Sequence, residues 1–432
     1  MKYLLRCVSC RNQYKGTEIR NRCNCGEILE VEQDFHLLKG NSIKKLFQER
    51  LRTSLFPYQS GVWRYKELLL PIKEKYIISK PEGNTNLYSV GYEESGGFGS
   101  IGKYVGIAKI YLKHEGENPT GSFKDRGMTV GISVAKMLGI KAVACASTGN
   151  TSASLSSYAA QAGLKCFVFL PQGKISISKL AQSIAYGAIN IQIDGDFDEA
   201  LLSVERLSKD FGLYHLNSIN PFRIEGQKTI IFELLQQLNW QVPDWIILPG
   251  GNLGNTSAIG KGLLELRKLQ NINKLPKIAV IQASGADPFY QSFKTGFKKR
   301  LKIEANTLAT AIRIGNPVSI LKAQKVIQET EGVVEQVTDQ EILDAKAIVD
   351  SSGIGCEPAS ATTVAGLKKL IIKKIIKKSD FVVGILTGHL LKDTDTTIKY
   401  HQETLSSIKS HFGNKVIETN QKNIKKIIES WL

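Results

Sequence analysis

Short apolar runs alternate with helix-length segments over most of this chain, and this alternation limits the fold more than any other feature. Segments with helical spacing of their apolar residues, such as 128–138 and 152–162, lie between the runs. Seven runs have the length of strands: 107–112, 142–146, 166–170, 189–193, 245–248, 278–282 and 381–385. Strands that alternate with helices usually form a parallel sheet covered by helices. The pattern therefore predicts an α/β protein, with enough strands for two lobes.

The composition is that of a globular chain with a large core. The 432 residues are 42% apolar and 22% charged, a balance that needs no disulfide framework to fold. No run of about eighteen or more apolar residues occurs, so we expect neither a transmembrane helix nor a membrane partner. The first residues lack the long apolar stretch of a secretory signal. We therefore expect a cytoplasmic protein.

The formal net charge of +17 would suit a nucleic acid, an acidic membrane or an anionic substrate, because positive charge concentrates anions nearby. The densest basic block, residues 368–378, alternates lysine pairs with apolar pairs. This spacing is typical of an amphipathic helix with its lysines in solvent. We therefore predict a surface helix at this block and no nucleic-acid partner.

Composition divides the chain into four segments. Residues 1–35 carry four cysteines, 36–80 have the pattern of helices and connections, 81–390 hold the alternating runs, and 391–432 are polar with a mostly helical pattern. We predict a zinc-ribbon-like segment, an N-terminal helical extension, a two-lobed main domain and a C-terminal helical segment, in that order.

The four N-terminal cysteines, Cys7, Cys10, Cys23 and Cys25, follow the spacing C-x2-C-x12-C-x-C. Four thiolates suit a tetrahedral structural zinc. Only one residue separates the second pair, which is tighter than the usual zinc spacing. The sequence therefore leaves two alternatives open, a zinc site or an unmetallated form of the same small fold.

The loop at residues 115–127 joins a predicted strand to the start of a helix, and Lys124 lies at the helix entrance. Burial and the dipoles of a helix N-terminus lower the pKa of a lysine in such a place. An amine of this kind can form a Schiff base with an aldehyde cofactor such as pyridoxal phosphate. The neighbouring Asp125 and Arg126 leave a surface ion pair as the alternative.

Two further loops also run from a strand to a helix. Residues 146–154 are small and hydroxyl-rich, and residues 248–256 are rich in glycine and asparagine. Such loops present free N–H groups to a carboxylate or phosphate, and glycine permits close approach of the backbone. A plain helix cap is the alternative for the first loop and a structural turn for the second.

Taken together, the three loops resemble, in this order, those of the threonine synthases among the fold-type-II pyridoxal-phosphate enzymes. The resemblance spans roughly residues 80–395. It extends to the segments 82–85, 194–198, 217–229, 309–315, 357–361 and 387–389. It implies a tryptophan synthase β-like fold, in which two α/β lobes hold the cofactor in the cleft between them.

The resemblance also implies roles for individual residues. Lys124 carries the cofactor and moves protons, and Thr151 joins it as a catalytic residue. The implied cofactor-binding residues are Lys124, Phe123, Asn150, Gly251, Asn252, Leu253, Gly254, Asn255 and Thr387. The implied substrate-binding residues are Thr148, Asn150, Thr151, Ser218, Arg223 and Asn252. Arg223 and Ser218 are expected to hold a phosphate of the substrate, for which the planar guanidinium is well suited.

The implied reaction converts O-phospho-L-homoserine and water to L-threonine and phosphate, in a homodimer. A dehydratase or a β-replacing synthase of the same fold is the nearest alternative. A non-catalytic relative that binds RNA through its basic surface is a third. Aromatic platforms among the lysines would favour RNA, and none is evident in the sequence.

Overall fold

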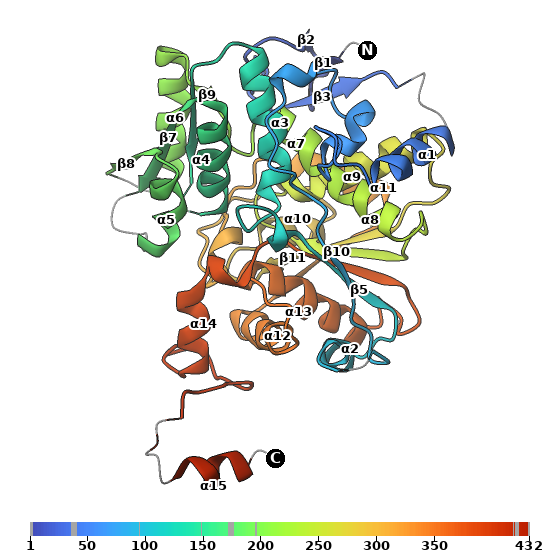
Figure 1. Cartoon of the computed structure of the whole chain (residues 1–432), viewed down its shortest axis with the longest axis vertical. Coiled ribbons are helices and arrows are strands. Elements are labelled where there is room, and N and C mark those ends of the chain that lie inside the picture. The colour runs from blue at the N-terminus through green and yellow to red at the C-terminus, as the bar shows by residue number, and fades with distance from the viewer. Residues whose placement is uncertain are drawn as a thin grey trace.

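The computed structural model describes residues 3–35, 41–94, 96–147, 149–171, 177–194, 197–417, 419 and 423–430. Its main body contains two sheets with helices on both faces, and a small antiparallel sheet lies at the N-terminal end (Figure 1). This arrangement is the α/β architecture that the alternating apolar runs predict.

The larger sheet has six strands in the order β12-β11-β10-β13-β5-β4. All neighbours are parallel except β4, which runs antiparallel to β5. The strands are β4 (Leu87–Ser89), β5 (Ile110–His114), β10 (Trp245–Pro249), β11 (Lys277–Ala283), β12 (Val333–Val337) and β13 (Val382–Leu386). Every residue of β10 and β13 is buried, as expected for central parallel strands with both faces covered.

Helices cover both faces of this sheet. On one face, Ile246 of β10 shares a hydrophobic cluster with α8 (Thr229–Gln237), α9 (Gly254–Lys268) and α11 (Ile320–Glu329). On the other face, Ile247 shares a cluster with α2 (Phe98–Val105), α12 (Asp339–Ser351) and α13 (Pro358–Ile372). The alternation of successive side chains along a strand produces these two separate layers.

The smaller sheet has four parallel strands in the order β8-β7-β6-β9. Its strands are β6 (Ala142–Ala146), β7 (Lys165–Pro171), β8 (Ile189–Ile193) and β9 (Tyr214–His215). The helices of this lobe are α3 (Lys124–Met137), α4 (Asn150–Ala162), α5 (Ile177–Ala185), α6 (Phe197–Phe211) and α7 (Pro221–Gln227). Figure 1 shows α4, α5 and α6 in green beside this sheet.

Helices α3 and α7 approach each other more closely than side chains would allow. A Cβ atom on Gly226 would lie 1.8 Å from the carbonyl oxygen of Arg126, and one on Gly127 would lie 2.8 Å from that of Arg223. Glycine is therefore required at this crossing. The contact places the N-terminal end of α3, where Lys124 lies, near Arg223 of α7.

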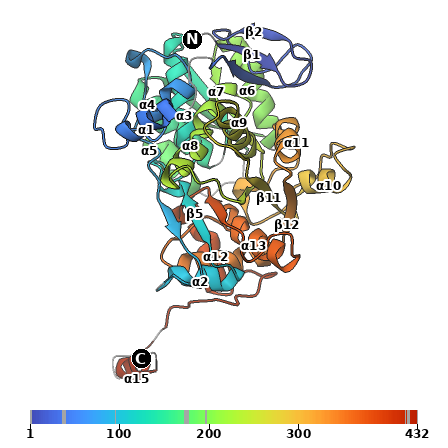
Figure 2. The ribbon, with the colours of Figure 1, turned by 90° about the vertical axis from the view of Figure 1, so that its right-hand side faces the viewer.

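The two ends of the chain add elements beyond the two lobes. Strands β1 (Tyr3–Cys7), β2 (Gln13–Lys15) and β3 (Leu29–Gln33) form the N-terminal sheet, followed by α1 (Asn41–Arg50). Helix α14 (Thr394–His401) packs near the body, whereas α15 (Ile424–Glu429) lies apart from it (Figures 1 and 2). The division of the chain into four segments stays a prediction. The remaining helical elements are α10 (Pro288–Lys294) and five short 3₁₀ helices, at Trp63–Leu68, Glu74–Tyr76, Glu115–Glu117, Thr310–Ile312 and Leu390–Lys392.

Three details differ from the sequence-based expectation. The strand expected at 107–112 runs instead from Ile110 to His114. The apolar run stops at residue 112, whereas the strand continues through Lys113, whose charge is buried in an ion pair with Glu233. Helices α3 and α4 begin four and two residues earlier than expected. The lysine block does not form one helix: α13 ends at Ile372, and Lys374 adopts a left-handed φ of +58°, which terminates a helix.

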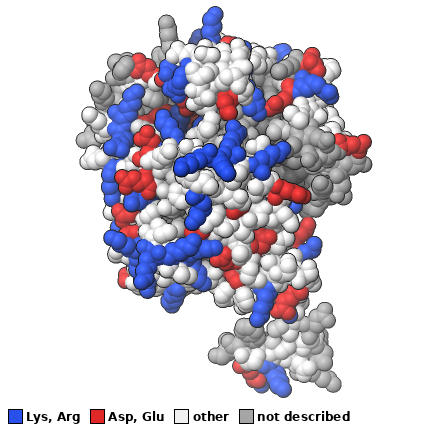
Figure 3. Space-filling view, turned by 180° about the vertical axis from the view of Figure 1, so that it is seen from behind, with Lys and Arg blue, Asp and Glu red and all other residues white. Residues whose placement is uncertain are grey.

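Basic side chains are scattered over one face of the molecule, with acidic side chains between them (Figure 3). Some lysines of block 368–378 contact the body: Lys373 pairs with Glu335 at 2.5 Å, and Lys368 lies 3.6 Å from the ring centroid of Tyr104. Part of the positive charge therefore serves the fold. Among the described residues, none of the helices has both the length and the apolar character required to cross a bilayer.

Candidate active site

A cleft lies between the two lobes, lined by loops from both. The loop after β6 and helix α7 contribute from the smaller lobe, and the loop after β10 and the end of β13 from the larger. Twelve of the predicted site residues line it: Phe123, Lys124, Asn150, Thr151, Ser218, Arg223, Gly251, Asn252, Leu253, Gly254, Asn255 and Thr387. Thr148 lies outside the described residues. The structure therefore brings together residues up to 264 positions apart, from Phe123 to Thr387.

Lys124 is the first residue of α3 and so lies at the entrance of the helix, although the helix itself was expected to begin only at residue 128. Its Nζ atom lies 4.0 Å from the ring centroid of Phe123. Burial and the charge of Arg223 lower the pKa of Lys124 to about 7, although Glu357 opposes this effect. A lysine in this state is partly unprotonated at neutral pH, so its amine can act as a nucleophile or a base.

The loop after β10, at the start of α9, is a candidate anion-binding cradle. Leu253 adopts a left-handed φ of +62° immediately before the helix, and Gly254 and Asn255 of its first turn line the cleft. The first N–H groups of a helix have no acceptor within it, so they are available to an anion. The side-chain nitrogen and oxygen of Asn255 and the hydroxyl of Thr256 are buried and have no hydrogen-bond partner among the described residues. Buried polar atoms normally have a hydrogen-bond partner, so these three atoms are available to a ligand.

Asn150, at the start of α4, is held by an acidic residue from the other lobe. Its Nδ2 atom donates to both carboxylate oxygens of Glu357, at 3.2 and 3.0 Å. Burial raises the pKa of Glu357, while Asn150, Lys392 and Lys124 lower it. The contact fixes the orientation of the Asn150 amide within the cleft.

Thr387, the residue that follows β13, is oriented by a neighbouring serine. Its hydroxyl lies 3.0 Å from Ser360 Oγ, which also accepts hydrogen bonds from the N–H groups of Thr387 and Gly388 at 2.8 and 2.9 Å. Thr387 is buried but lines the cleft. It therefore offers a neutral hydroxyl in a fixed position.

Arg223 is a buried cation with few partners. One of its terminal nitrogens donates to the carbonyl oxygen of Leu216 at 2.9 Å, and its Nε has no partner among the described residues. Burial lowers the pKa of Arg223 to about 10. Nearby, Asn252 Nδ2 donates to Ser218 Oγ at 3.1 Å. This side of the cleft can bind a second anion.

These residues fit the cofactor that the resemblance implies. Pyridoxal phosphate needs an amine, an anion-binding cradle for its phosphate and a partner for its ring nitrogen. Lys124, the cradle with Asn255, and the hydroxyl of Thr387 provide these three groups in one cleft. The individual roles stay predictions.

The sequence-based prediction missed several residues of the cleft. Glu357, Lys392 and Asn217 also line it. Glu357 occurs in the matched segment 357–361, where it precedes a proline at the start of a helix. A helix-capping position was thus the only local signal of Glu357, and it does not reveal a contact with Asn150.

Comparisons with known proteins identify the family to which the chain belongs. Residues 78–388 match the sequence model of a family described as pyridoxal-phosphate dependent enzyme. The chain is 48% identical over 405 residues to threonine synthase of Methanocaldococcus jannaschii, which covers 93% of this chain and 96% of that protein. It is 40% identical over 425 residues to threonine synthase 2, chloroplastic, of Arabidopsis thaliana, covering 96% of this chain and 81% of that protein.

A solved structure confirms the predicted fold class. Maize serine racemase superposes with a TM-score of 0.62 at 21% identity and covers 86% of this chain and 99% of that chain. At this identity the likeness concerns the fold alone. The sequence matches confirm the predicted cofactor, pyridoxal phosphate. The chain belongs to the threonine synthases, within the family of pyridoxal-phosphate-dependent enzymes.

Proposed function

We propose that this cleft converts O-phospho-L-homoserine and water to L-threonine and phosphate. The observation that carries the choice of substrate is Arg223, a buried guanidinium that lines the same cleft as Lys124 and whose Nε atom has no partner in the described part of the chain. A substrate phosphate would supply the missing acceptors. The membership in the threonine synthases supports the same reaction.

Two separate anion-binding places support a phosphorylated substrate. The cradle at the start of α9 would hold the cofactor phosphate, and Arg223 with Ser218 would hold that of the substrate. Asn252 lies between them, because it belongs to the loop that precedes α9 and its side chain donates to Ser218 Oγ at 3.1 Å. Its own Oδ1 accepts from the N–H of Val318 at 2.7 Å. An enzyme acting on unphosphorylated threonine or serine would leave Arg223 without an anion, which is unfavourable for a buried charge.

The amine of Lys124 would perform the proton transfers. Pyridoxal phosphate, when bound, withdraws electrons from the carbon atoms of an attached amino acid and makes their protons acidic. With a pKa of about 7, Lys124 can accept a proton from Cα or Cβ of the substrate and return one to Cγ after phosphate departs. Phe123 lies against the Lys124 side chain and restricts its position.

The first turn of α4 would orient the substrate carboxylate. Its N–H groups have no carbonyl four residues earlier within the helix, so they are available to an anion. Asn150 and Thr151 occupy this turn, and both line the cleft. This position would align the substrate with Lys124 across the cleft.

The cytoplasmic location and the homodimeric state also stay predictions.

The test is to supply purified enzyme, loaded with pyridoxal phosphate, with O-phospho-L-homoserine and to measure phosphate and threonine in the same sample. Equal amounts of both products are expected. A parallel sample with threonine alone measures ammonia, the product of a dehydratase. The Lys124→Ala variant is the matched control for adventitious hydrolysis. Ammonia release without phosphate release would overturn the proposal in favour of a dehydratase.

A further inference from the structure

The four N-terminal cysteines form a cluster distinct from the catalytic cleft. We propose that Cys7, Cys10, Cys23 and Cys25 bind one Zn²⁺ ion that maintains the fold of the N-terminal sheet and its contact with α7. The ligand atoms of all four cysteines lie within 4.8 Å of one another. None of the four lines the cleft.

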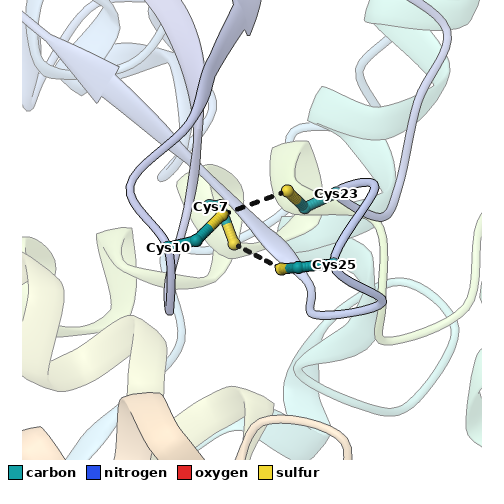
Figure 4. Close-up of side chains that lie close together, drawn as sticks. All are labelled: Cys7, Cys10, Cys23 and Cys25. Carbon is teal, nitrogen blue, oxygen red and sulfur yellow. Dashed lines mark hydrogen bonds between the residues drawn. The ribbon is translucent and has the colours of Figure 1, made fainter.

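The spacing of the sulfur atoms fits a tetrahedral zinc. Four sulfurs about 2.3 Å from a central Zn²⁺ lie about 3.8 Å from one another at tetrahedral angles. Here Cys7 Sγ and Cys25 Sγ are 3.5 Å apart, and Cys10 Sγ and Cys23 Sγ are 3.4 Å apart. The four side chains converge from two loops (Figure 4). Little movement is therefore needed to accept the ion.

Two turns bring the ligands together. Cys7 ends β1 and Cys10 lies in the turn that follows it, whereas Cys23 and Cys25 lie in the turn before β3. The second turn is closed by a hydrogen bond from the N–H of Gly26 to the carbonyl of Cys23, and Gly26 has a φ of +90°. Only glycine adopts this φ without strain, so the turn is suited to bring two ligands separated by one residue to the same point.

Hydrogen-bond donors point at the sulfurs. The N–H of Ser9 donates to Cys7 Sγ at 3.4 Å, and the hydroxyl of Tyr14 lies 3.1 Å from Cys23 Sγ. Donors to sulfur favour the thiolate, which is the form that binds zinc, and such outer contacts are typical of metal sites. Cys10 and Cys25 are exposed, so the ion can enter from solvent.

The position of the cluster indicates a structural role. Leu5, Cys7 and Val31 share a hydrophobic cluster with Phe222 of α7. Gln33 of β3 donates to Glu225 of α7 at 3.1 Å. A sheet of three short strands has little core of its own, so metal binding would contribute much of the free energy that keeps it folded. Loss of the ion should therefore weaken the packing of the N-terminal sheet against α7.

The experiment is elemental analysis of the full-length protein purified under reducing conditions. We expect about one zinc per chain. The double variant Cys10→Ser/Cys25→Ser, which removes one ligand from each turn, should lose at least about 90% of that zinc. The control Cys166→Ser should retain it, since Cys166 is buried in β7 beside Ser156, whose hydroxyl can bond the new serine.

A second measurement decides the question if the double variant does not fold. A mercurial thiol reagent should release zinc from the wild-type chain, which a chromogenic chelator detects, together with faster hydrogen exchange at residues 221–227. Wild-type protein that carries no zinc, that carries iron instead, or that has the four cysteines in two disulfides by intact mass would overturn the proposal. Release of zinc with unchanged exchange at α7 would overturn its structural part.

Discussion

Two arginines of this molecule are equally buried but have very different hydrogen-bond partners. The contrast distinguishes an arginine that stabilises the fold from one that can bind a ligand. Arg126 is 0% exposed and Arg223 is 1% exposed. Arg126 donates to Glu115 at 2.6 and 2.8 Å and to Glu233 at 2.8 Å, and these carboxylates hold its pKa above the usual range despite burial. Arg223 pairs with no carboxylate among the residues that the structure describes, and burial lowers its pKa.

A buried charge is costly unless it is paired. Arg126 and its two carboxylates meet this requirement within the chain and join α3, α8 and the turn after β5. We expect Arg223 to meet it when an anion enters the cleft. Lys124, two residues before Arg126 on the same helix, belongs with Arg223, because its pKa is also lowered by burial. The incompletely paired cations, Lys124 and Arg223, therefore indicate the candidate site. The fully paired cation, Arg126, joins the elements around it.

The largest expected effect is that of Lys124→Ala. Removal of the amine should abolish the borohydride-reducible linkage to pyridoxal phosphate and lower kcat at least about 10³-fold. Mass spectrometry of peptides after reduction measures the linkage. Lys392→Ala is the matched control, because Lys392 is the other lysine among the described residues of the cleft. A linkage that persists in Lys124→Ala and disappears in Lys392→Ala would reverse the assignment.

Arg126→Met tests the structural half of the comparison. The substitution leaves two buried carboxylates without their shared cation, so we expect a loss of about 3–5 kcal/mol in the free energy of unfolding. Urea denaturation followed by fluorescence measures it. Lys113 still pairs with Glu233 at 2.6 Å, but its single ammonium does not replace the hydrogen bonds that Arg126 donates to both Glu115 and Glu233. A urea midpoint equal to that of wild type would show that the pairing of Arg126 contributes nothing to stability.

Arg223→Met tests the functional half and should have the opposite profile. The free energy of unfolding should stay within about 1 kcal/mol of wild type or rise, because the substitution removes an incompletely paired buried charge. The kcat/KM for the phosphorylated substrate should fall about 10²–10³-fold. Arg223→Lys should recover part of this loss, since a single ammonium replaces a planar fork. An Arg223→Met enzyme that is destabilised as much as Arg126→Met would remove the distinction between the two arginines.

How far the sequence could predict the fold depended on whether burial and apolarity coincide. Strands such as β6 and β10 are apolar throughout, and their predicted bounds agree with the structure within a residue. Strand β12 escaped prediction because Glu335 and Gln336 interrupt its pattern at an edge of the sheet. Strand β9 has only two residues, which is too short for any periodicity to be recognised.

The candidate site could likewise be predicted from the sequence only in part. The three loops could be predicted because turn residues and helix starts are local signals. The contact of Glu357 with Asn150 spans 207 positions, so no local pattern contains it. The missing partner of Arg223 was equally hidden, because an arginine in a sequence shows neither its burial nor its hydrogen bonds. Only the folded chain reveals which charges are left incompletely paired.

The pH dependence of cofactor capture should report the interaction between Lys124 and Arg223. Capture requires the neutral amine, so with a pKa of about 7 the rate at which apoenzyme binds pyridoxal phosphate covalently should rise about tenfold per pH unit below 7 and level off above about 8. Rapid mixing followed by borohydride trapping measures it. In Arg223→Met the midpoint should move to higher pH, because the loss of a neighbouring cation makes protonation of Lys124 easier. A midpoint near 10 in wild type would show that Lys124 is not desolvated.

The smallest expected effect belongs to Ser218→Ala. The serine hydroxyl is neutral and already accepts a hydrogen bond from Asn252, so its contribution to substrate phosphate should be about 0.5–1.5 kcal/mol. This corresponds to a rise of about 2- to 12-fold in KM, with kcat and cofactor absorbance unchanged. Ser360→Ala, in contrast, should alter cofactor absorbance, because Ser360 orients Thr387. If Ser218→Ala weakened the enzyme as much as Arg223→Met, a hydrogen bond to Ser218, and not the incompletely paired charge of Arg223, would be the main determinant of substrate binding.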